Sequence, residues 1–227
     1  MPTIDVHSTT SARRTGKEYR AVHEFVDTPG RKDERHDIKK IHEFGEMIRD
    51  NDLAVLRKAG VAEKDVGHSL KVAQKALDIA RRTEASVDME FVGRAALFHD
   101  LGKAQTHAIE HGRLGAEAGK KLGLPESITA VMEKHIRGGL TKPEARELGL
   151  PEKDYTLRTL EERIIVYADR LVDIITDGVV KTEPEAEERF EEILSTNVRY
   201  GKNEATLQRY LSYHREIQGL IKKGEAK

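Results

Sequence analysis

The stretch Ala95-Ala96-Leu97-Phe98-His99-Asp100-Leu101-Gly102-Lys103 carries two metal-binding side chains at the polar end of an apolar segment. Burial alone would not place His99 and Asp100 there, because a buried polar group costs free energy unless it has a partner. An isolated His-Asp pair is a weak signal, since such neighbours also meet by chance. Four more residues that can bind metals are spaced around the pair, each in or beside an expected helix: His68, His111, His135 and Asp169. The complete series predicts a metal site lined by several helices.

The segment upstream of this pair has helical periodicity. From Glu63 to Arg82, apolar residues recur at spacings of three and four, which predicts an α-helix. His68 shares a second apolar stripe with Val72 and Ile79, so this helix is expected to be packed on two faces. A histidine on such a stripe is more often a buried structural residue than a ligand, but the downstream pair favours a ligand.

Sequence signals also mark the ends of the helices that carry the other candidate ligands. Asp88 is expected to cap a helix that runs through Phe98 and stops at Gly102, with the glycine in the left-handed conformation. A further helix opens at His111, and another ends near His135.

Three capping signatures place the later helices: Thr141-x-x-Glu144, Thr159-x-x-Glu162 and Thr182-x-x-Glu185. The second starts a long apolar helix that contains Asp169, whose carboxylate needs a metal ion or an arginine as its partner. Asp173 follows four residues later on the same face and is either a neighbour of the site or an ordinary surface residue.

The chain divides into three parts by composition. Residues 1–36 are polar and predict an N-terminal extension, residues 37–178 hold the metal-ligand series, and residues 179–227 predict a C-terminal pair of helices for packing or dimerisation. The first helix of that pair runs from Thr182 through Leu194, and His214 in the second is expected to be structural. A second His-Asp pair, His36-Asp37, follows a charged segment and is interpreted as a helix start. No strand pattern is present, so the expected fold is all-α.

Composition narrows the chemistry. The 227 residues include 39 Lys and Arg against 40 Asp and Glu, and they contain no Trp, so nothing indicates a nucleic-acid surface. Cysteine is absent, which excludes disulfides, thiolate nucleophiles and cysteine-bound zinc. The expected metal therefore takes nitrogen and oxygen ligands, as Mn, Fe, Co, Ni, Mg and catalytic Zn do. With no signal-peptide or membrane-span pattern, a cytoplasmic protein is expected.

The motif order resembles the HD-domain superfamily of metal-dependent phosphohydrolases. The resemblance covers residues 50–178 and rests on the series H…HD…H…H…D, with His-Asp-Leu-Gly-Lys at 99–103 and His-Gly-x-x-Gly-Ala-Glu at 111–117. Further matching segments are Glu133-Lys134-His135-Ile136-Arg137-Gly138-Gly139, Leu148-Gly149-Leu150-Pro151, and Thr159-Leu160-Glu161-Glu162-Arg163 leading to Ala168-Asp169. These segments resemble a small HDIG-type branch of stand-alone HD proteins, and they imply a multi-helix HD bundle with a C-terminal helical appendage.

The resemblance also implies roles for the ligand series. In the superfamily the first His, the HD pair and the final Asp hold one metal, which implies His68, His99, Asp100 and Asp169 here. Two additional histidines hold a second metal in some members, and His111 and His135 match their positions, with Asp100 bridging. Two divalent ions are therefore expected, with metal-activated water attacking a phosphoester.

Three further residues are candidates for substrate contact. Lys103 matches a lysine that contacts phosphate in some members, although a lysine near a helix C-terminus is also favoured by the helix dipole. His107 is a substrate contact, a partner of a ligand, or a surface residue. Arg137 either meets phosphate or is an exposed arginine. Arg170, next to Asp169, is expected to point away from the site.

Three functions remain open. The first is a phosphohydrolase, a phosphomonoesterase or a phosphodiesterase, that acts on a nucleotide or similar small phosphoester and could form a homodimer. The second is a di-iron oxygenase of the HD type, and the third is a non-catalytic nucleotide-binding sensor.

Overall fold

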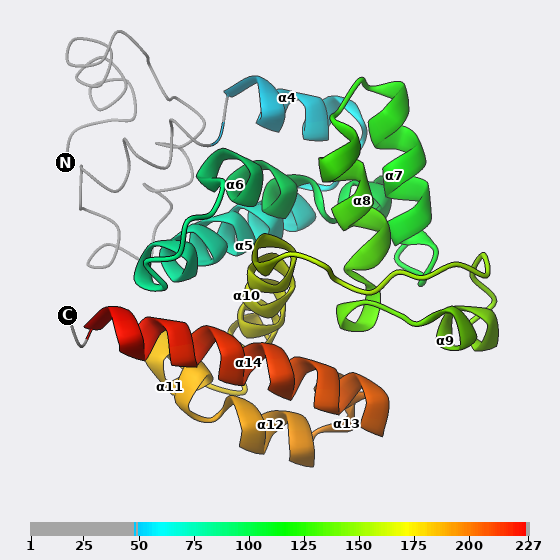
Figure 1. Ribbon diagram of the computed structural model, residues 1–227. Coiled ribbons are helices and arrows are strands. Elements are labelled where there is room, and N and C mark those ends of the chain that lie inside the picture. The colour runs from blue at the N-terminus through cyan, green and yellow to red at the C-terminus, as the bar shows by residue number, and fades with distance from the viewer. Residues whose placement is uncertain (1–47, 49, 226–227) are drawn as a thin grey trace, which may run out of the picture.

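The computed structural model describes residue 48 and residues 50–225, and its regular elements within these residues are all helical (Figure 1). This confirms the expected all-α fold. Within this range no helix has both the length and the apolarity that crossing a bilayer demands. The expected 1–36 extension and the His36-Asp37 pair lie outside the described residues. In chain order the elements are α4 (Asp50–Lys58), α5 (Glu63–Arg82), α6 (Met89–Phe98), η1 (Leu101–Ala104), α7 (His111–Lys121), α8 (Glu126–Lys134), η2 (Ile136–Gly138), α9 (Lys142–Glu147), α10 (Leu160–Thr176), α11 (Glu183–Glu188), α12 (Phe190–Thr196), α13 (Val198–Gly201) and α14 (Glu204–Glu225).

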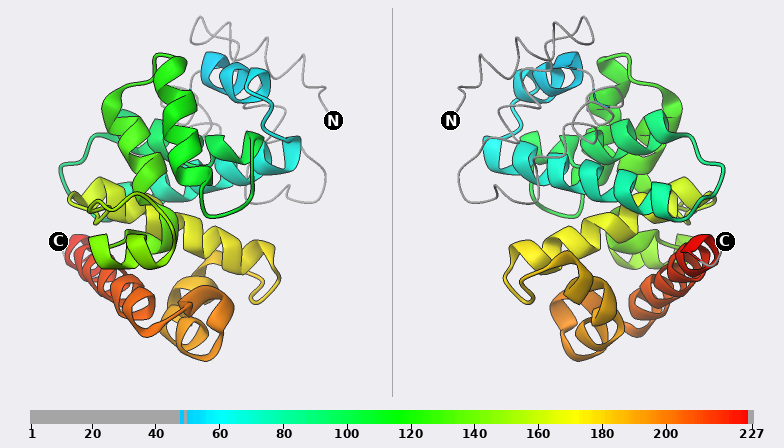
Figure 2. Two further views of the ribbon diagram at one scale, coloured as in Figure 1. Left: turned by 90° about the vertical axis from the view of Figure 1, so that its right-hand side faces the viewer. Right: turned by 90° about the vertical axis from the view of Figure 1, so that its left-hand side faces the viewer.

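Helix α5 is the centre of the bundle. It spans Glu63–Arg82, the bounds that its periodicity predicts, and it packs most extensively against α6 and α10. Both predicted stripes are buried, so the helix needs neighbours on two sides. In the views of Figures 1 and 2, α10 lies between the group α4–α8 and the group α11–α14.

The predicted helix starts are confirmed by side-chain caps. The Asp88 carboxylate accepts a hydrogen bond of 2.9 Å from the Phe91 amide at the start of α6. The capping boxes at Thr141 and Thr159 are both formed, and the Thr182 hydroxyl accepts from the Glu185 amide. Such caps satisfy amides that the first turn leaves without partners.

Gly102 differs from the expectation. Helix α6 ends at Phe98, and Gly102 lies inside η1 without the left-handed conformation expected of it. The structure needs a glycine here for space, because a Cβ at this position would lie 1.9 Å from the backbone oxygen of His111 and 2.7 Å from the Gly115 amide nitrogen. The turn after Asp100 thus touches the backbone of α7 directly.

Gly102→Ala should therefore destabilise the protein by about 2–3 kcal/mol, the usual cost of forcing extra volume into a packed position. The matched control is Gly67→Ala in α5, where an added Cβ meets no atom within 4 Å. Since alanine is the better helix former, that control should raise stability by about 0.5–1 kcal/mol. Denaturant unfolding of the two variants checks the difference, and equal effects would contradict the close approach.

The C-terminal segment also differs in detail. The helix expected from Thr182 through Leu194 breaks at Arg189 into α11 and α12. The break lets Glu187 reach α5 while Phe190 packs against the Tyr167 ring, with ring centroids 4.9 Å apart. Buried residues of these helices belong to the same hydrophobic cluster as α5 and α10.

His214 has the structural role expected of it. Its Nδ1 lies 2.8 Å from the Tyr167 hydroxyl, and its ring stacks on Phe190 with centroids 5.1 Å apart. Burial lowers the pKa of His214, so the ring is neutral and accepts the tyrosine hydrogen bond.

Glu187 ties the C-terminal segment to α5 by charge. Its Oε1 accepts from Lys75 Nζ at 2.6 Å and from Arg82 Nη1 at 2.8 Å, and Lys75 is almost completely buried. Burial opposes ionisation of Glu187, but the Arg82 and Lys75 contacts outweigh it and lower its pKa to about 2. The carboxylate therefore contributes stability above its ordinary pKa of 4.5, and this contribution is lost as the pH falls toward 2.

Glu187→Gln should cost about 3 kcal/mol at pH 7, because it leaves the Lys75 ammonium buried without a full counter-charge. The difference between wild type and variant should shrink as the pH is lowered from about 4.5 toward 3, since the wild-type carboxylate then begins to lose its advantage. Unfolding curves across this range test both statements. A difference that stays constant with pH would exclude a charge effect.

Candidate metal centre

All six predicted ligands come together in one place. His68 comes from α5, His99 and Asp100 follow the end of α6, and Asp169 comes from α10. His111 is the first residue of α7, and His135 follows the end of α8. Two groups of ligand atoms lie within 4.8 Å of one another: His68, His99 and Asp100, and Asp100, His111 and His135.

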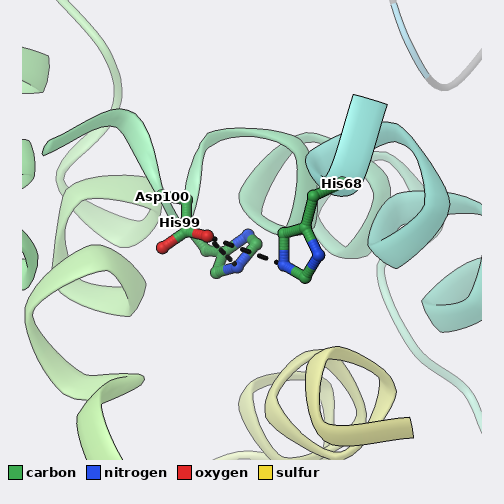
Figure 3. Close-up of side chains that lie close together, drawn as sticks. All are labelled: His68, His99 and Asp100. Carbon is green, nitrogen blue, oxygen red and sulfur yellow. Dashed lines mark ion pairs between the residues drawn. The ribbon is translucent and has the colours of Figure 1, made fainter. Parts of the chain in front are cut away.

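Asp100 belongs to both groups and faces them with different oxygens. Its Oδ2 lies 3.2 Å from His99 Nε2 and 3.6 Å from His68 Nε2. Its Oδ1 lies 3.3 Å from His111 Nε2 and 3.5 Å from His135 Nε2. Figure 3 shows the carboxylate and the rings of His68 and His99 directed toward one another. A carboxylate can bind one cation through each oxygen, so this orientation suits two ions.

Asp169 completes the first group. Its Oδ1 lies 3.0 Å from His68 Nε2 and 3.4 Å from His99 Nε2. Asp173, one turn further along α10, also offers an oxygen within 4.8 Å of His68 and Asp169. Of the two interpretations of Asp173, the structure therefore supports a neighbour of the site.

Backbone carbonyls orient three of the imidazoles. His99 Nδ1 bonds to the Ala96 oxygen, His111 Nδ1 to the Ala108 oxygen and His135 Nδ1 to the Met132 oxygen, each at 2.7 Å. A carbonyl only accepts, so each Nδ1 carries the proton and each Nε2 has a free lone pair. All three lone pairs face Asp100, which is the orientation of a metal-binding histidine.

Without a cation this arrangement leaves polar atoms unmatched. His111 Nε2 and His135 Nε2 lie 3.0 Å apart, so two lone pairs face each other unless a cation or proton lies between them. His99 Nε2 and Asp100 Oδ2 are buried, and neither makes a hydrogen bond of good geometry. Two divalent cations would satisfy these atoms, so the donor set fits metal ions.

The pKa shifts agree with a site built for positive charge. Burial opposes charge on His99, yet the Asp100 and Asp169 carboxylates raise its pKa to about 10. Burial also opposes charge on Asp100, but His99, His111 and His135 hold its pKa well below the usual range. Burial lowers the pKa of His135, which keeps this imidazole in the neutral form that binds metals.

A cavity of about 300 Å³ opens beside these ligands. Lys103, His107 and Arg137, the three candidate substrate contacts, all line it. Lys103 Nζ lies 2.5 Å from Asp100 Oδ2, whereas His107 is mostly exposed and its Nε2 lies 3.3 Å from Asp65 Oδ2. Lys103 is thus the candidate in direct contact with a predicted ligand.

Three other lining residues change the sequence-based picture: Arg170, Lys202 and Tyr210. Arg170 does not point away from the site as expected, because its Nη1 lies 3.6 Å from Asp173 Oδ2 at the cavity wall. Lys202 and Tyr210 come from the C-terminal segment and were not predicted. No spacing rule links these two residues to the ligand series. The sequence signal near them is the turn pattern Gly201-Lys202-Asn203, which does not indicate a cavity.

Comparison with known proteins identifies the family. The HD-domain family model matches residues 65–172. A protein of Methanocaldococcus jannaschii is 39% identical over 168 residues, which cover 71% of this chain and 92% of that protein. The chain belongs to the HD-domain family. The fold and donor set of this HD protein are accordingly those of a family of metal-dependent phosphohydrolases.

Other similarities are partial. A tRNA (cytidine(56)-2′-O)-methyltransferase of Thermoplasma volcanium is 35% identical over 52% of this HD protein and 35% of its own length. Ribonuclease Y of Geotalea uraniireducens is 34% identical over 36% of this chain and 17% of the enzyme. The HD domain of the L. monocytogenes phosphodiesterase PgpH, crystallised with cyclic-di-AMP, aligns with a TM-score of 0.51 and 18% identity over 74% of this chain and 95% of that one. The last similarity shows a shared fold.

Divalent metal should stabilise the folded protein. Metal present at 100 times its Kd adds about 2.7 kcal/mol to the free energy of unfolding. We expect Mn²⁺ to raise the melting temperature of metal-stripped protein, and His99→Gln to remove most of that increase. The control is His107→Gln, which should keep it because His107 contacts Asp65 rather than Asp100. A His99 variant that responds like wild type would contradict the site.

Proposed function

We propose that this HD protein is a divalent-metal-dependent phosphohydrolase that acts on a nucleotide or related small phosphoester, with two ions sharing Asp100. One ion would be held by His68, His99, Asp169 and Asp100 Oδ2. The other would be held by His111, His135 and Asp100 Oδ1. The observation that carries the proposal is the orientation of the Asp100 carboxylate, each oxygen of which faces a different pair of imidazoles.

The chemistry follows from that donor set. Divalent ions held there would lower the pKa of water toward neutrality and would neutralise charge on phosphoryl oxygens. The protein has no cysteine, so a thiolate nucleophile is excluded. The role of the protein is to aim three imidazoles, through the Nδ1 bonds to backbone carbonyls that leave each Nε2 toward Asp100.

Lys103 supplies a fixed positive charge beside the ligands. Burial lowers its pKa, but Asp100 more than compensates and the pKa rises above the ordinary value, so the ammonium stays charged at neutral pH. An ammonium at the cavity wall attracts a phosphoryl oxygen and steadies the charge that develops on it.

The volume and the charged lining of the cavity favour a small, anionic substrate. Its volume of about 300 Å³ is at the lower end for ligand pockets, and its lining is rich in charge. The partial similarity to ribonuclease Y and the shared fold with PgpH favour phosphodiesters among the candidates, and a nucleotide fits both the volume and the charge.

The test is hydrolysis by metal-stripped protein that has been reconstituted separately with Mn²⁺, Fe²⁺, Co²⁺, Ni²⁺, Zn²⁺ and Mg²⁺. The panel comprises nucleoside mono- and diphosphates, cyclic dinucleotides and short RNA. We expect metal-dependent turnover that falls at least about 1000-fold in Asp100→Ala, because that change removes the ligand common to both ions. His135→Gln should lower the bound metal from two ions to one, measured by elemental analysis.

The outcomes separate the three functions left open by the sequence. Turnover that persists in Asp100→Ala would show that the activity comes from elsewhere. Dioxygen consumption with Fe²⁺ and no phosphate release would favour the oxygenase. Tight nucleotide binding without turnover under any metal would favour the sensor.

A further inference from the structure

The cavity beside the candidate ligands is rich in positively charged side chains. Four cationic side chains from different elements line the described cavity: Lys103, Arg137, Arg170 and Lys202. Lys103 is paired with Asp100. The other three belong to η2, α10 and the turn after α13, so tertiary packing brings them to one cavity.

Arg137 and Lys202 have no counter-ion. Within residues 50–225, neither side chain makes a hydrogen bond or an ion pair, although both line a cavity that contains three carboxylates. The burial of Lys202, together with the positive charges of Arg170 and Arg137, lowers the pKa of this lysine. Two cations that form no ion pair, beside a third cation, make that part of the cavity attractive to an anion.

The backbone holds both residues in an unfavourable conformation. Arg137 has φ 51° and Lys202 has φ 61°, whereas a side chain other than glycine seldom adopts positive φ. The surrounding structure enforces the conformation at Arg137: Arg209 Nη1 donates to the Arg137 oxygen at 3.0 Å, and the Tyr213 hydroxyl donates to the Gly138 oxygen at 3.0 Å. Strain of this kind persists where the surroundings support it, and it concentrates at ligand sites.

The buried Arg170 side chain has one hydrogen-bond donor without a partner. It is 9% exposed, its Nη2 donates to the Tyr210 hydroxyl at 3.1 Å, and its guanidinium lies 4.7 Å from the centre of the Tyr210 ring. Its Nε, however, has no hydrogen-bond partner. The side chain lines the cavity as a nearly buried cation, and Asp173 Oδ2 at 3.6 Å from its Nη1 is its carboxylate neighbour.

Another cavity, in the part of the chain that the structure describes, provides a contrast. It has a volume of about 680 Å³ and its lining includes three cations, Lys75, Arg82 and Lys222, the first two of which are paired with Glu187. Four carboxylates in the same lining, Asp78, Glu183, Glu187 and Glu188, outnumber these cations. The cavity beside the candidate ligands is different, because its four Lys and Arg side chains outnumber its three carboxylates.

We propose that Arg137, Arg170 and Lys202 bind a second phosphoryl group of the substrate, while the reacting phosphoryl group lies at the metal ligands. The substrate class is then a nucleotide with two phosphoryl groups rather than a nucleoside monophosphate. The assignment of the reacting group rests on the proposed function, whereas anion binding by the three cations does not require it.

The test measures binding without metal. Isothermal titration in EDTA compares AMP, ADP and adenosine 3′,5′-bisphosphate on wild type, Arg137→Asn and Lys202→Gly. These replacements remove the charge but tolerate positive φ, so the fold should be kept. Wild type should bind at least one of the two-phosphate nucleotides about tenfold more tightly than AMP, and each variant should lose most of that preference, as expected for a charged hydrogen bond. Lys223→Ala, an exposed lysine near the end of α14, is the matched control and should behave like wild type.

The result distinguishes this proposal from the proposed function. Equal binding of all three nucleotides by wild type, or an unchanged preference in both variants, overturns the anion subsite even if hydrolysis is observed. A preference that the variants lose supports the subsite even if the hydrolysis panel is silent. If both assays succeed, Lys202→Gly should slow turnover of the two-phosphate substrate mainly through KM, because Lys202 binds a group remote from the reaction.

Discussion

The buried carboxylate of Asp100 is the constraint around which the rest of the structure is arranged. Imidazoles from four helical segments surround it, and Lys103 contacts it from the following turn. An isolated buried charge would cost several kcal/mol or more, so these partners must be held close to it. This requires α6 and α8 to end beside the site and α7 to begin there. The turn that carries Asp100 must also lie against the backbone of α7, which explains why position 102 has room for hydrogen alone.

Helix termination and ligand orientation depend on the same hydrogen bonds. The last carbonyls of a helix have no amide partner within the helix. At the ends of α6 and α8, the residues that follow are His99 and His135, and each ring bonds to a carbonyl three residues before it. The carbonyl gains a donor, and the imidazole is fixed with Nε2 toward Asp100. A ligand on a rigid helix end therefore needs little reorganisation to bind a cation.

The C-terminal segment is part of the wall of the site as well as a packing element. Arg209 and Tyr213 of α14 bond to backbone oxygens of Arg137 and Gly138, next to the ligand His135. The same segment contributes Lys202 and Tyr210 to the cavity, although the family model ends at residue 172. The candidate ligand series thus lies within the part of the chain that the family model matches, whereas the wall from residues 200–213 lies outside it.

The sequence by itself determined the all-α class, the bounds of α5, the capped helix starts and the HD family. These features depend on local periodicity, on capping side chains and on a motif order that can be read along the chain. It also determined the six candidate ligands, which the structure brings together, because their order along the chain matches the motif order of the HD superfamily. Only the tertiary structure decided why position 102 is glycine, where the C-terminal helices break and that Arg170 faces the cavity. It also decided that Lys202 lines the same cavity as Asp100, a residue more than a hundred positions earlier in the chain. Those features depend on contacts between segments distant in sequence, and no local pattern carries that information.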